Sequence, residues 1–421
     1  MDIKIHGNKN VKGVVNISGS KNSCLAILCA SALTKGKVEL FNVPKISDIY
    51  DMASILKYVN CKVKFKRNKL IIDSSNITYK PLILELCQRF RASYYFIGVF
   101  LTLFNKCEIS LPGGCNIGKR PIDYHIDGFT KMGFKCEIKE NVLCVTKDTK
   151  NTSYDVTLTN KSVGTTINIL LGSLSFKQGF IRNSLVEPEC EDLIIFLNKI
   201  GYNILLNKDV IITNTGNTVL KSIKHSIIPD RIETMTYTVL GLLCGKILVK
   251  NCNPKHLLIP LNILLDAGYD IKIQNDCLHV NKSVGNQINI KTDVYPGFPT
   301  DLQPIFGVLI SQTKIGGTVE ETIFENRLQI YKDLISIGVL CQIENNLVNI
   351  NPGEVNSFVL KAVDLRQGAA LIILALLGKD ESTINNFEYV LRGYDKLFKK
   401  LKKIGVRIYK KRECKFFLFV V

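Results

Sequence analysis

The sequence predicts an α/β protein of two domains, each with three repeated units around buried helices: a two-domain inside-out α/β barrel. Three observations predict this fold. The chain has 421 residues, which is too long for one ordinary hydrophobic core. A pattern of apolar helix, short strand, second helix and turn into another strand recurs six times along it. The helix that opens each unit is apolar on nearly all sides.

The turn that ends each second helix marks the repeat most clearly. Successive turns are 73, 68, 67, 70 and 67 positions apart, so six units account for nearly the whole chain. The first turn has an asparagine where the later ones have glycine, and the six positions are Asn60, Gly133, Gly201, Gly268, Gly338 and Gly405.

Each unit has two kinds of helix. The first kind, rich in small and apolar residues, is expected to be buried. It is predicted at 23–33, 93–103, 165–174, 234–243, 301–309 and 368–377. The second kind, as at 48–58 and 394–404, has one apolar stripe and one charged face, as surface helices do.

The first strands suggest how the units divide into domains. The segments 3–6 and 14–18 precede the first helix and have no earlier unit to join, so we expect both to pair with the last unit. Residues 1–20 and 230–421 would then form one domain, and 21–229 would form the other, which carries Cys115. The chain would cross near Ser20 and Asp230. Because ligands prefer clefts between domains, we expect the active site there.

Composition excludes several classes of protein. The formal charge is +18, but the lysines are dispersed, and the one dense basic run, 396–412, is interpreted as a solvated helix face. We therefore expect no nucleic-acid partner. The longest apolar runs, such as 369–377, are too short to span a bilayer, and the N-terminal stretch lacks a signal peptide's apolar core. We expect a cytosolic protein without a membrane partner.

The 14 cysteines are scattered singly, without a CxxC pair. Neither a zinc site nor a disulfide framework has the required spacing. We expect no metal and no cofactor.

The stretch 111–125, LPGGCNIGKRPIDYH, is the strongest candidate for chemistry. Its Pro-Gly-Gly opening gives the backbone freedom to move as a loop. Cys115 is followed by Lys119 and Arg120, and nearby cations make a thiol reactive. Arg120 has a planar fork suited to phosphate or carboxylate. The alternative is a surface turn with an incidental cysteine.

Polar residues mark the N-terminal end of every expected core helix. Helix capping alone would account for Ser162, Thr300 and Asp364. It does not account for Arg91, Arg231 and Arg366, because a cation is disfavoured at the positive end of a helix dipole unless an anion is present. Only 11 arginines occur in a chain with 44 lysines, which favours a need for bidentate geometry at those that lie in loops.

Together these motifs resemble the UDP-N-acetylglucosamine 1-carboxyvinyltransferases, enolpyruvyl transferases of peptidoglycan synthesis. The resemblance covers essentially the whole chain. The motifs that carry it are SGSKN at 18–22, NVPK at 42–45, RAS at 91–93, the stretch 111–125, SVG at 162–164, PDRIET at 229–234, FPTD at 298–301, FENR at 324–327, DLR at 364–366 and RGY at 392–394.

The resemblance implies that a sugar hydroxyl adds to C2 of phosphoenolpyruvate and that phosphate is then eliminated. It implies Cys115 as the acid for C3, Asp301 as the base at the sugar 3-hydroxyl and Asp364 as an aid to proton removal, with Lys21 and Arg392 also catalytic. The residues implied for phosphoenolpyruvate are Lys21, Asn22, Arg120, Arg327 and Arg392. Those implied for the sugar nucleotide are Arg91, Arg120, Pro121, Ile122, Asp123, Tyr124, Lys161, Ser162, Val163, Gly164, Asp301 and Ile323.

The sequence departs from the family pattern at Asn160, Tyr124 and Gln367, and none of these departures removes an acid, base or clamp residue. We expect an active bacterial enzyme, favour a monomer, and expect sensitivity of its thiol to epoxide antibiotics of the fosfomycin type. Two alternatives stay open: enolpyruvyl transfer to shikimate 3-phosphate, and a non-catalytic regulatory homologue.

Overall fold

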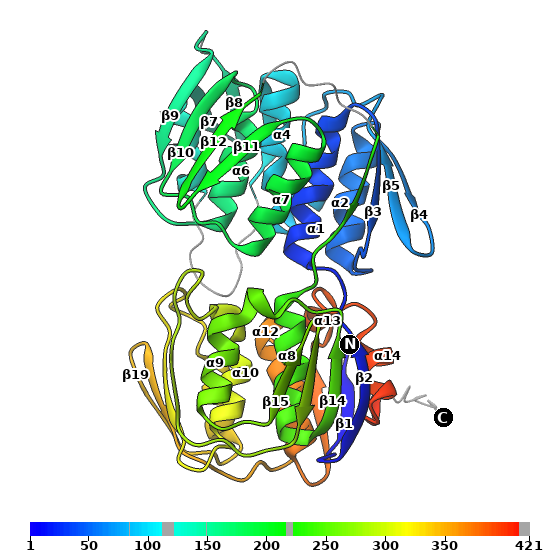
Figure 1. The fold of residues 1–421 in the computed structure, drawn as a ribbon, viewed down its shortest axis with the longest axis vertical. Coiled ribbons are helices and arrows are strands. Elements are labelled where there is room, and N and C mark those ends of the chain that lie inside the picture. The colour runs from blue at the N-terminus through cyan, green and yellow to red at the C-terminus, as the bar shows by residue number, and fades with distance from the viewer. Residues whose placement is uncertain (84, 112–121, 149, 216–221, 412–421) are drawn as a thin grey trace, which may run out of the picture. The chain divides into compact units, whose positions relative to one another are not determined.

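A computed structural model describes residues 1–421 except 84, 112–121, 149, 216–221 and 412–421 (Figure 1). The fold is mixed α/β. The chain divides into two compact units, each described here by itself. Unit 1 comprises Met1–Ile17, Arg231–Asp293 and Phe298–Val421, and unit 2 comprises Ser18–Asp230 and Val294–Gly297.

Unit 2 has three sheets around three central helices. The helices are α1 (Lys21–Ala30), α4 (Tyr95–Phe104) and α6 (Val163–Ser173), and α4 packs against both of the others. In sheet order, the first sheet has β13 (Ile223–Ser226), β3 (Lys37–Phe41), β5 (Lys69–Asp73) and β4 (Lys62–Phe65). The second sheet has β6 (Lys106–Ser110), β8 (Val142–Lys147) and β7 (Phe134–Lys139). The third sheet has β11 (Asn203–Asn207), β12 (Val210–Asn214), β10 (Gln178–Arg182) and β9 (Ser153–Thr157). The other helices are α2 (Ser47–Tyr58), α3 (Glu85–Gln88), α5 (Asp123–Lys131) and α7 (Pro188–Lys199), with short 3-10 turns η1 (Ser31–Thr34) and η2 (Arg91–Tyr94).

Unit 1 repeats this plan with three further sheets. Its central helices are α8 (Arg231–Cys244), α10 (Gln303–Ile310) and α12 (Leu365–Leu377), which pack against one another. In sheet order, the first sheet has β21 (Val359–Lys361), β22 (Glu381–Asn385), β1 (Ile3–His6) and β23 (Ile408–Lys410). The second sheet has β15 (Ile271–Gln274), β16 (Cys277–Asn281), β14 (Gly245–Lys250) and β2 (Val11–Asn16). The third sheet has β17 (Ile288–Lys291), β18 (Gly317–Glu320), β20 (Leu347–Ile350) and β19 (Cys341–Glu344). The other helices are α9 (Leu258–Asp266), α11 (Gln329–Ser336), α13 (Glu388–Leu391) and α14 (Leu397–Lys403), with 3-10 turns η3 (Pro254–Leu257) and η4 (Thr300–Leu302).

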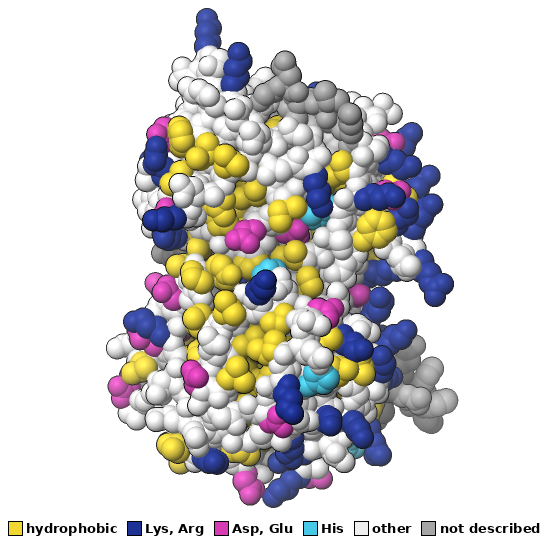
Figure 2. Space-filling view, in the orientation of Figure 1, with side chains coloured by type: hydrophobic (Ala, Val, Ile, Leu, Met, Phe, Trp, Pro, Cys, Tyr) yellow, Lys and Arg dark blue, Asp and Glu magenta, His cyan; other side chains and the backbone are white. Residues whose placement is uncertain are grey.

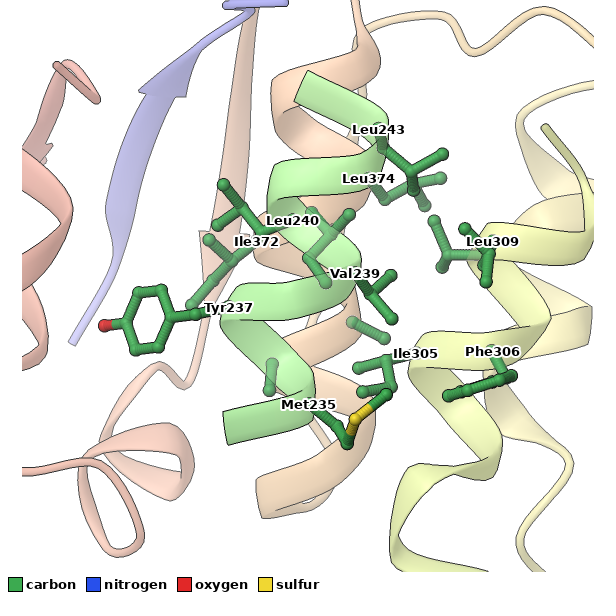
Figure 3. Packing of buried hydrophobic residues seen from close by; sticks show 14 of the residues in the cluster. Met235, Tyr237, Val239, Leu240, Leu243, Ile305, Phe306, Leu309, Ile372 and Leu374 are labelled. Carbon is green, nitrogen blue, oxygen red and sulfur yellow. The ribbon is translucent and has the colours of Figure 1, made fainter. Parts of the chain in front are cut away.

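The central helices are as buried as their composition predicts. All 14 residues of α8 and all eight of α10 are buried. Figure 3 shows Met235 and Val239 of α8 directed toward Ile305 and Leu309 of α10, with Leu374 of α12 beside Leu243. Burial of side chains of this size is the main stabilising contribution to such a core, at about 1.5–3 kcal/mol each.

The six turns share one backbone conformation. Each has a positive φ, between 68° at Asn60 and 107° at Gly201. Glycine reaches this region without steric cost, and asparagine tolerates it better than most residues. The recurring Gly or Asn is therefore explained by the backbone geometry that ends each second helix.

The strands at the crossing points pair differently from the sequence prediction. The strand β1 joins the last sheet, pairing with β22 and β23 as expected. The strand β2 does not: it lies parallel to β14, which follows α8. Similarly, the strand β13 precedes α8 but lies parallel to β3, the strand that follows α1. Periodicity cannot detect this exchange, because it locates strands but not their partners.

The two segments that carry these exchanged strands bond to each other. Asp230 donates its backbone N–H to Ser18 O at 2.9 Å, and Ser20 donates its own to Ile228 O at 2.7 Å. Gly19 and Pro229 form an antiparallel bridge. These contacts fix the segments that lead into α1 and α8.

The surface charge is dispersed on the face in view. Figure 2 shows Lys and Arg side chains spread over this face, with Asp and Glu side chains between them. In the part of the chain that the structure describes, no helix combines the length and apolar character needed to cross a bilayer.

Candidate functional site

In unit 1 the Asp301 carboxylate lies between two guanidinium groups. Asp301 belongs to η4, directly before α10. Its Oδ1 is 2.8 Å from Arg327 Nη2. Its Oδ2 accepts hydrogen bonds from Arg366, at 2.7 Å from Nη2 and 3.0 Å from Nε. Both arginines are buried, at 4% and 6% exposed, so the carboxylate compensates two charges that lie largely away from water.

This arrangement sets the protonation state of Asp301. Burial by itself raises the pKa of the carboxyl, but the charges and hydrogen bonds of Arg366 and Arg327 outweigh burial and hold the pKa far below its usual range. Asp301 is therefore ionised at any physiological pH. A carboxylate so firmly held accepts a proton readily only if a bound ligand weakens one of these contacts.

The loop that carries Ile323 and Arg327 is organised by a buried glutamate. Glu321, 3% exposed, accepts hydrogen bonds from the backbone N–H groups of Ile323 and Phe324 at 2.8 and 3.1 Å. It also accepts one from Thr300 Oγ1 at 2.8 Å, and Thr300 in turn accepts one from Arg327 Nη1 at 3.0 Å. Glu321 thus ties the loop to the turn that holds Asp301.

Asp364 caps α12. Its Oδ1 accepts the backbone N–H groups of Arg366 and Gln367 at 2.6 and 3.0 Å, which presents Arg366 from the first turn of the helix. The side chain of Gln367, a departure from the family pattern, makes three hydrogen bonds. It donates to Asp333 Oδ2 at 2.6 Å and to Lys361 O at 3.2 Å, and accepts from Val363 N at 3.0 Å. The glutamine side chain at this position therefore stabilises the start of α12.

Arg392 directly follows α13, and the segment after it is tied to the first turns of α8. Tyr394 Oη and Thr236 Oγ1 are 2.9 Å apart. Lys400 of α14 donates to Glu233 at 2.5 Å, and the Glu233 side chain is 2% exposed. These contacts tie the segment that follows Arg392 to α8.

In unit 2 the Lys21 segment forms the N-terminus of α1. Ser20 caps the helix, accepting from Ser23 N. The Lys21 backbone N–H donates to Asp230 at 3.3 Å, and Lys21 Nζ is 3.3 Å from Asp48 Oδ2. Asn22 is exposed. The ammonium group of Lys21, whose side chain is 17% exposed, thus lies beside a buried carboxylate and within reach of solvent.

A second group of predicted residues in unit 2 gathers where α5 and α6 begin. Ile122 directly precedes α5, and Asp123 and Tyr124 are its first two residues. Ser162 caps α6 by accepting from Thr165 N at 3.3 Å. Val163 and Gly164 form the first turn of α6 and are half-buried. Lys161 is exposed, with Nζ 3.9 Å from Asp209, and Arg91 begins η2.

Three predicted site residues, Cys115, Arg120 and Pro121, lie outside the described residues. The described ones fall into two sets, one in each unit. Two residues that the sequence analysis left without a role lie within these sets: Arg366, which contacts Asp301, and His125, which lies beside the start of α6. The scarcity of arginine pointed to Arg366, and His125 is the last residue of the stretch 111–125 that the sequence analysis selected.

Comparison with solved structures defines the fold class. An enolpyruvyl transferase, NikO from Streptomyces tendae, matches with a TM-score of 0.88 at 18% identity, over 97% of this chain and 98% of that one. EPSP synthase from Acinetobacter baumannii matches with a TM-score of 0.78 at 14% identity, over 98% and 100%. The fold is thus that of the enolpyruvyl transferases.

Sequence comparison defines the family. The sequence model of EPSP synthase (3-phosphoshikimate 1-carboxyvinyltransferase) matches residues 5–401, and this chain belongs to that family. Two relatives are named UDP-N-acetylglucosamine 1-carboxyvinyltransferase. The one from Prochlorococcus marinus is 39% identical, over 96% of this chain and 90% of its own length. The one from Buchnera aphidicola is 36% identical, over 96% and 98%.

Proposed function

We propose that this enzyme transfers the enolpyruvyl group of phosphoenolpyruvate to the 3-hydroxyl of UDP-N-acetylglucosamine and releases phosphate, the first committed step of peptidoglycan precursor synthesis. The observation that carries the proposal is the near-full-length similarity, at 34–39% identity, to relatives that bear this activity as their name. The Pro-Gly-Gly-Cys sequence at 112–115 supports the sugar nucleotide over shikimate 3-phosphate as acceptor.

The reaction needs an anion clamp, because phosphoenolpyruvate carries a phosphate and a carboxylate. We assign the clamp to Lys21, Arg120, Arg327 and Arg392, and we assign Asn22 to binding of phosphoenolpyruvate beside them. Charge-assisted hydrogen bonds to such groups contribute about 1.5–3 kcal/mol each. Support for Arg327 comes from its burial beside Thr300 and Asp301, which fixes the direction of its fork.

The addition step needs a base for the sugar hydroxyl and an acid for C3. In this proposal Cys115 protonates C3, Asp301 receives the hydroxyl proton, and Asp364 assists proton removal from the tetrahedral intermediate. Since Arg366 and Arg327 lower the pKa of Asp301, Asp301 becomes an effective base only when the incoming hydroxyl displaces one of these hydrogen bonds. The displaced guanidinium is then available to the phosphate that leaves.

The remaining assignments concern the sugar nucleotide. In this proposal it is bound by Asp301 and Ile323 of unit 1 and by a set from unit 2. That set is Arg91, Arg120, Pro121, Ile122, Asp123, Tyr124, Lys161, Ser162, Val163 and Gly164. Support comes from the first turn of α6, whose backbone N–H groups suit a diphosphate.

The proposal also covers the domain division, the oligomeric state and the cellular location. The two units would correspond to the halves of an inside-out α/β barrel, with 21–229 as one domain and 1–20 with 230–421 as the other. The protein would act as a monomer in the bacterial cytoplasm, without nucleic acid.

Phosphate release tests the proposal. The purified chain is incubated with phosphoenolpyruvate and either UDP-N-acetylglucosamine or shikimate 3-phosphate. Release with the sugar nucleotide alone is the expected result. Release with shikimate 3-phosphate alone would show that shikimate 3-phosphate is the acceptor. Release with neither compound would favour a non-catalytic homologue.

A further inference from the structure

The carboxylate of Asp192 lies between three segments of unit 2. The residue belongs to α7 and is 2% exposed. Its Oδ2 accepts hydrogen bonds from Ser23 Oγ, in the first turn of α1, and from the backbone N–H of Ile228, at 3.2 Å. Its Oδ1 is 2.9 Å from His225 Nε2, in β13. One buried carboxylate therefore binds a helix, a strand and the segment that follows the strand.

The contacts of the His225 ring make it a donor to Asp192. The ring is 4% exposed and packs edge-on against Phe196 of α7, with centroids 5.5 Å apart. Its Nδ1 is 3.3 Å from Lys199 Nζ. An ammonium group only donates and a carboxylate only accepts, so both contacts are satisfied when the ring carries its proton on Nε2. Asp192 thus has three donors, which compensate for the removal of its charge from water.

A second carboxylate, that of Glu189, lies one turn earlier in α7. The hydroxyl of Ser20, the cap of α1, donates to Glu189 Oε1 at 3.4 Å. Glu189 is 3% exposed. Ser20 and Ser23 flank residues 21–22, which are assigned above to phosphoenolpyruvate. Both hydroxyls that border this pair are therefore bonded to α7.

The segment bonded to Asp192 also holds the backbone that leads to Lys21. Ile228 O accepts the backbone N–H of Ser20 at 2.7 Å. Two residues further on, Asp230 Oδ2 accepts the backbone N–H of Lys21 at 3.3 Å. Asp192 therefore acts on Lys21 by two routes, through the first turn of α1 and through the segment that follows β13.

We propose that Asp192 is a positioning residue, which fixes the start of α1 so that the Lys21 ammonium meets an anionic group of phosphoenolpyruvate. The inference rests on the proposed function and adds to it a residue to which the sequence analysis gave no role. Asp192 acts through Ser23 and the backbone around Lys21, because its own carboxylate is buried among α7, α1 and β13. Precise placement matters, since a misplacement of about 1 Å in a substrate-positioning group can lower a rate about 100-fold.

A matched pair of substitutions tests the contact from the side of α1. Ser23→Ala removes the hydroxyl that donates to Asp192. Ser31→Ala is the control: Ser31 lies at the other end of α1, is also 0% exposed, and donates to Ile27 O of the same helix at 2.7 Å. Phosphate release gives kcat/KM for phosphoenolpyruvate at saturating UDP-N-acetylglucosamine. Calorimetry gives the affinity for UDP-N-acetylglucosamine without phosphoenolpyruvate.

We expect Ser23→Ala to lower kcat/KM for phosphoenolpyruvate at least about tenfold, as loss of one hydrogen bond to a charged group does. The affinity for the sugar nucleotide should stay within about twofold, which is below the loss of one such bond. Ser31→Ala should leave both values unchanged within the same limit.

Substitutions of Asp192 itself supply the complementary test. Asp192→Ala leaves no acceptor for Ser23, and we expect a loss of kcat/KM at least as large as in Ser23→Ala. Asp192→Asn keeps one oxygen for Ser23 and Ile228, and its NH2 group can donate to His225 Nε2 once the ring proton moves to Nδ1. We therefore expect Asp192→Asn to retain most of the kcat/KM that Asp192→Ala loses.

Several results would overturn the inference. Equal kcat/KM in Ser23→Ala and the unaltered protein would do so, and so would equal losses of kcat/KM in Asp192→Asn and Asp192→Ala. A parallel loss of sugar-nucleotide affinity in Ser23→Ala would indicate a general distortion instead of a positioning role. If the unaltered protein releases no phosphate with UDP-N-acetylglucosamine, the proposed function fails together with the inference.

Discussion

Gly98 and Asn168 bring α4 and α6 into close contact. The backbone N–H of Gly98 donates to Asn168 Oδ1 at 2.9 Å, and a β-carbon on Gly98 would lie 2.4 Å from Asn168 O and 2.7 Å from Gly172 N. Backbone atoms cannot yield as a flexible side chain does. The position therefore admits only glycine, and the contact places Asn168 where it can hold His125.

We expect Gly98→Ala to lower the free energy of unfolding by about 1–3 kcal/mol, the usual cost of overpacking a core. Urea denaturation followed by circular dichroism measures the change. Gly36→Ala is the matched control, because its added β-carbon would meet only Thr34 O, at 3.5 Å. Equal stability of Gly98→Ala and the control would contradict the packing argument.

Asp301 should be essential for turnover and should be ionised in the substrate-free enzyme. We expect Asp301→Asn to lower kcat at least about 100-fold, the lower range for loss of a general base. The stabilising contribution of Asp301 is present above the ordinary pKa of aspartate, about 3.9, and is lost as the pH falls below that value, because its folded pKa is lower still. In the substrate-free enzyme, kcat/KM should therefore show no ionisation of Asp301 between pH 5 and 9.

Arg366→Lys offers a graded test of the same contact. Lysine keeps the charge but loses the fork that makes two hydrogen bonds to Asp301 Oδ2. We expect the pKa of Asp301 to rise toward the ordinary range and kcat to fall less than in Asp301→Asn. Identical kcat/KM profiles below pH 5 in Arg366→Lys and the unaltered protein would argue against control of Asp301 by Arg366.

His125 should make stability depend on pH. Its folded pKa of about 3 lies below the ordinary value of about 6.5, so the unfolded chain binds the extra proton. Stability is then complete above about pH 6.5 and falls as the pH decreases toward 3. In His125→Gln this contribution is absent. The difference in unfolding free energy between the two proteins should grow from pH 4 to pH 7, and a constant difference would show that His125 titrates normally.

Cys115 should be required as an acid. We expect Cys115→Asp to keep measurable turnover, because a carboxyl can supply a proton, and Cys115→Ser to keep almost none, because a serine hydroxyl is a far weaker acid. Phosphate release measures both. Cys277→Ser, at a partly exposed cysteine in β16, serves as the control. Full activity in Cys115→Ser would show that the reaction does not need the Cys115 thiol.

Gln367 should matter for stability more than for chemistry. Gln367→Ala removes the donor to Asp333 Oδ2, and burial already raises the pKa of Asp333. We expect a loss of about 1–3 kcal/mol in unfolding free energy, the cost of leaving a buried polar group unsatisfied. A larger effect on kcat than on stability would place Gln367 in the site instead.

The sequence by itself determined the repeat, the buried helices and the family. Local chemistry sets these features: an apolar segment such as 368–377 must be buried wherever it lies, and the glycine at a turn such as Gly268 adopts a positive φ through its own backbone. The order of the motifs from Lys21 to Arg392 can be recognised in the sequence alone, because each motif is a contiguous stretch of residues. For the same reason Asp301 and Asp364 could be selected as candidates before any contact was known.

Only the tertiary structure decided which distant groups meet. It paired β2 with β14 and β13 with β3, where periodicity had suggested the last unit for both early strands. It brought Arg366 onto Asp301, 65 positions away, and placed the His125 ring against Asn168, 43 positions away. Such contacts depend on the packing of whole helices and sheets. Proton affinity follows from them, because the charges and burial around a carboxyl or an imidazole are supplied by segments remote in the chain.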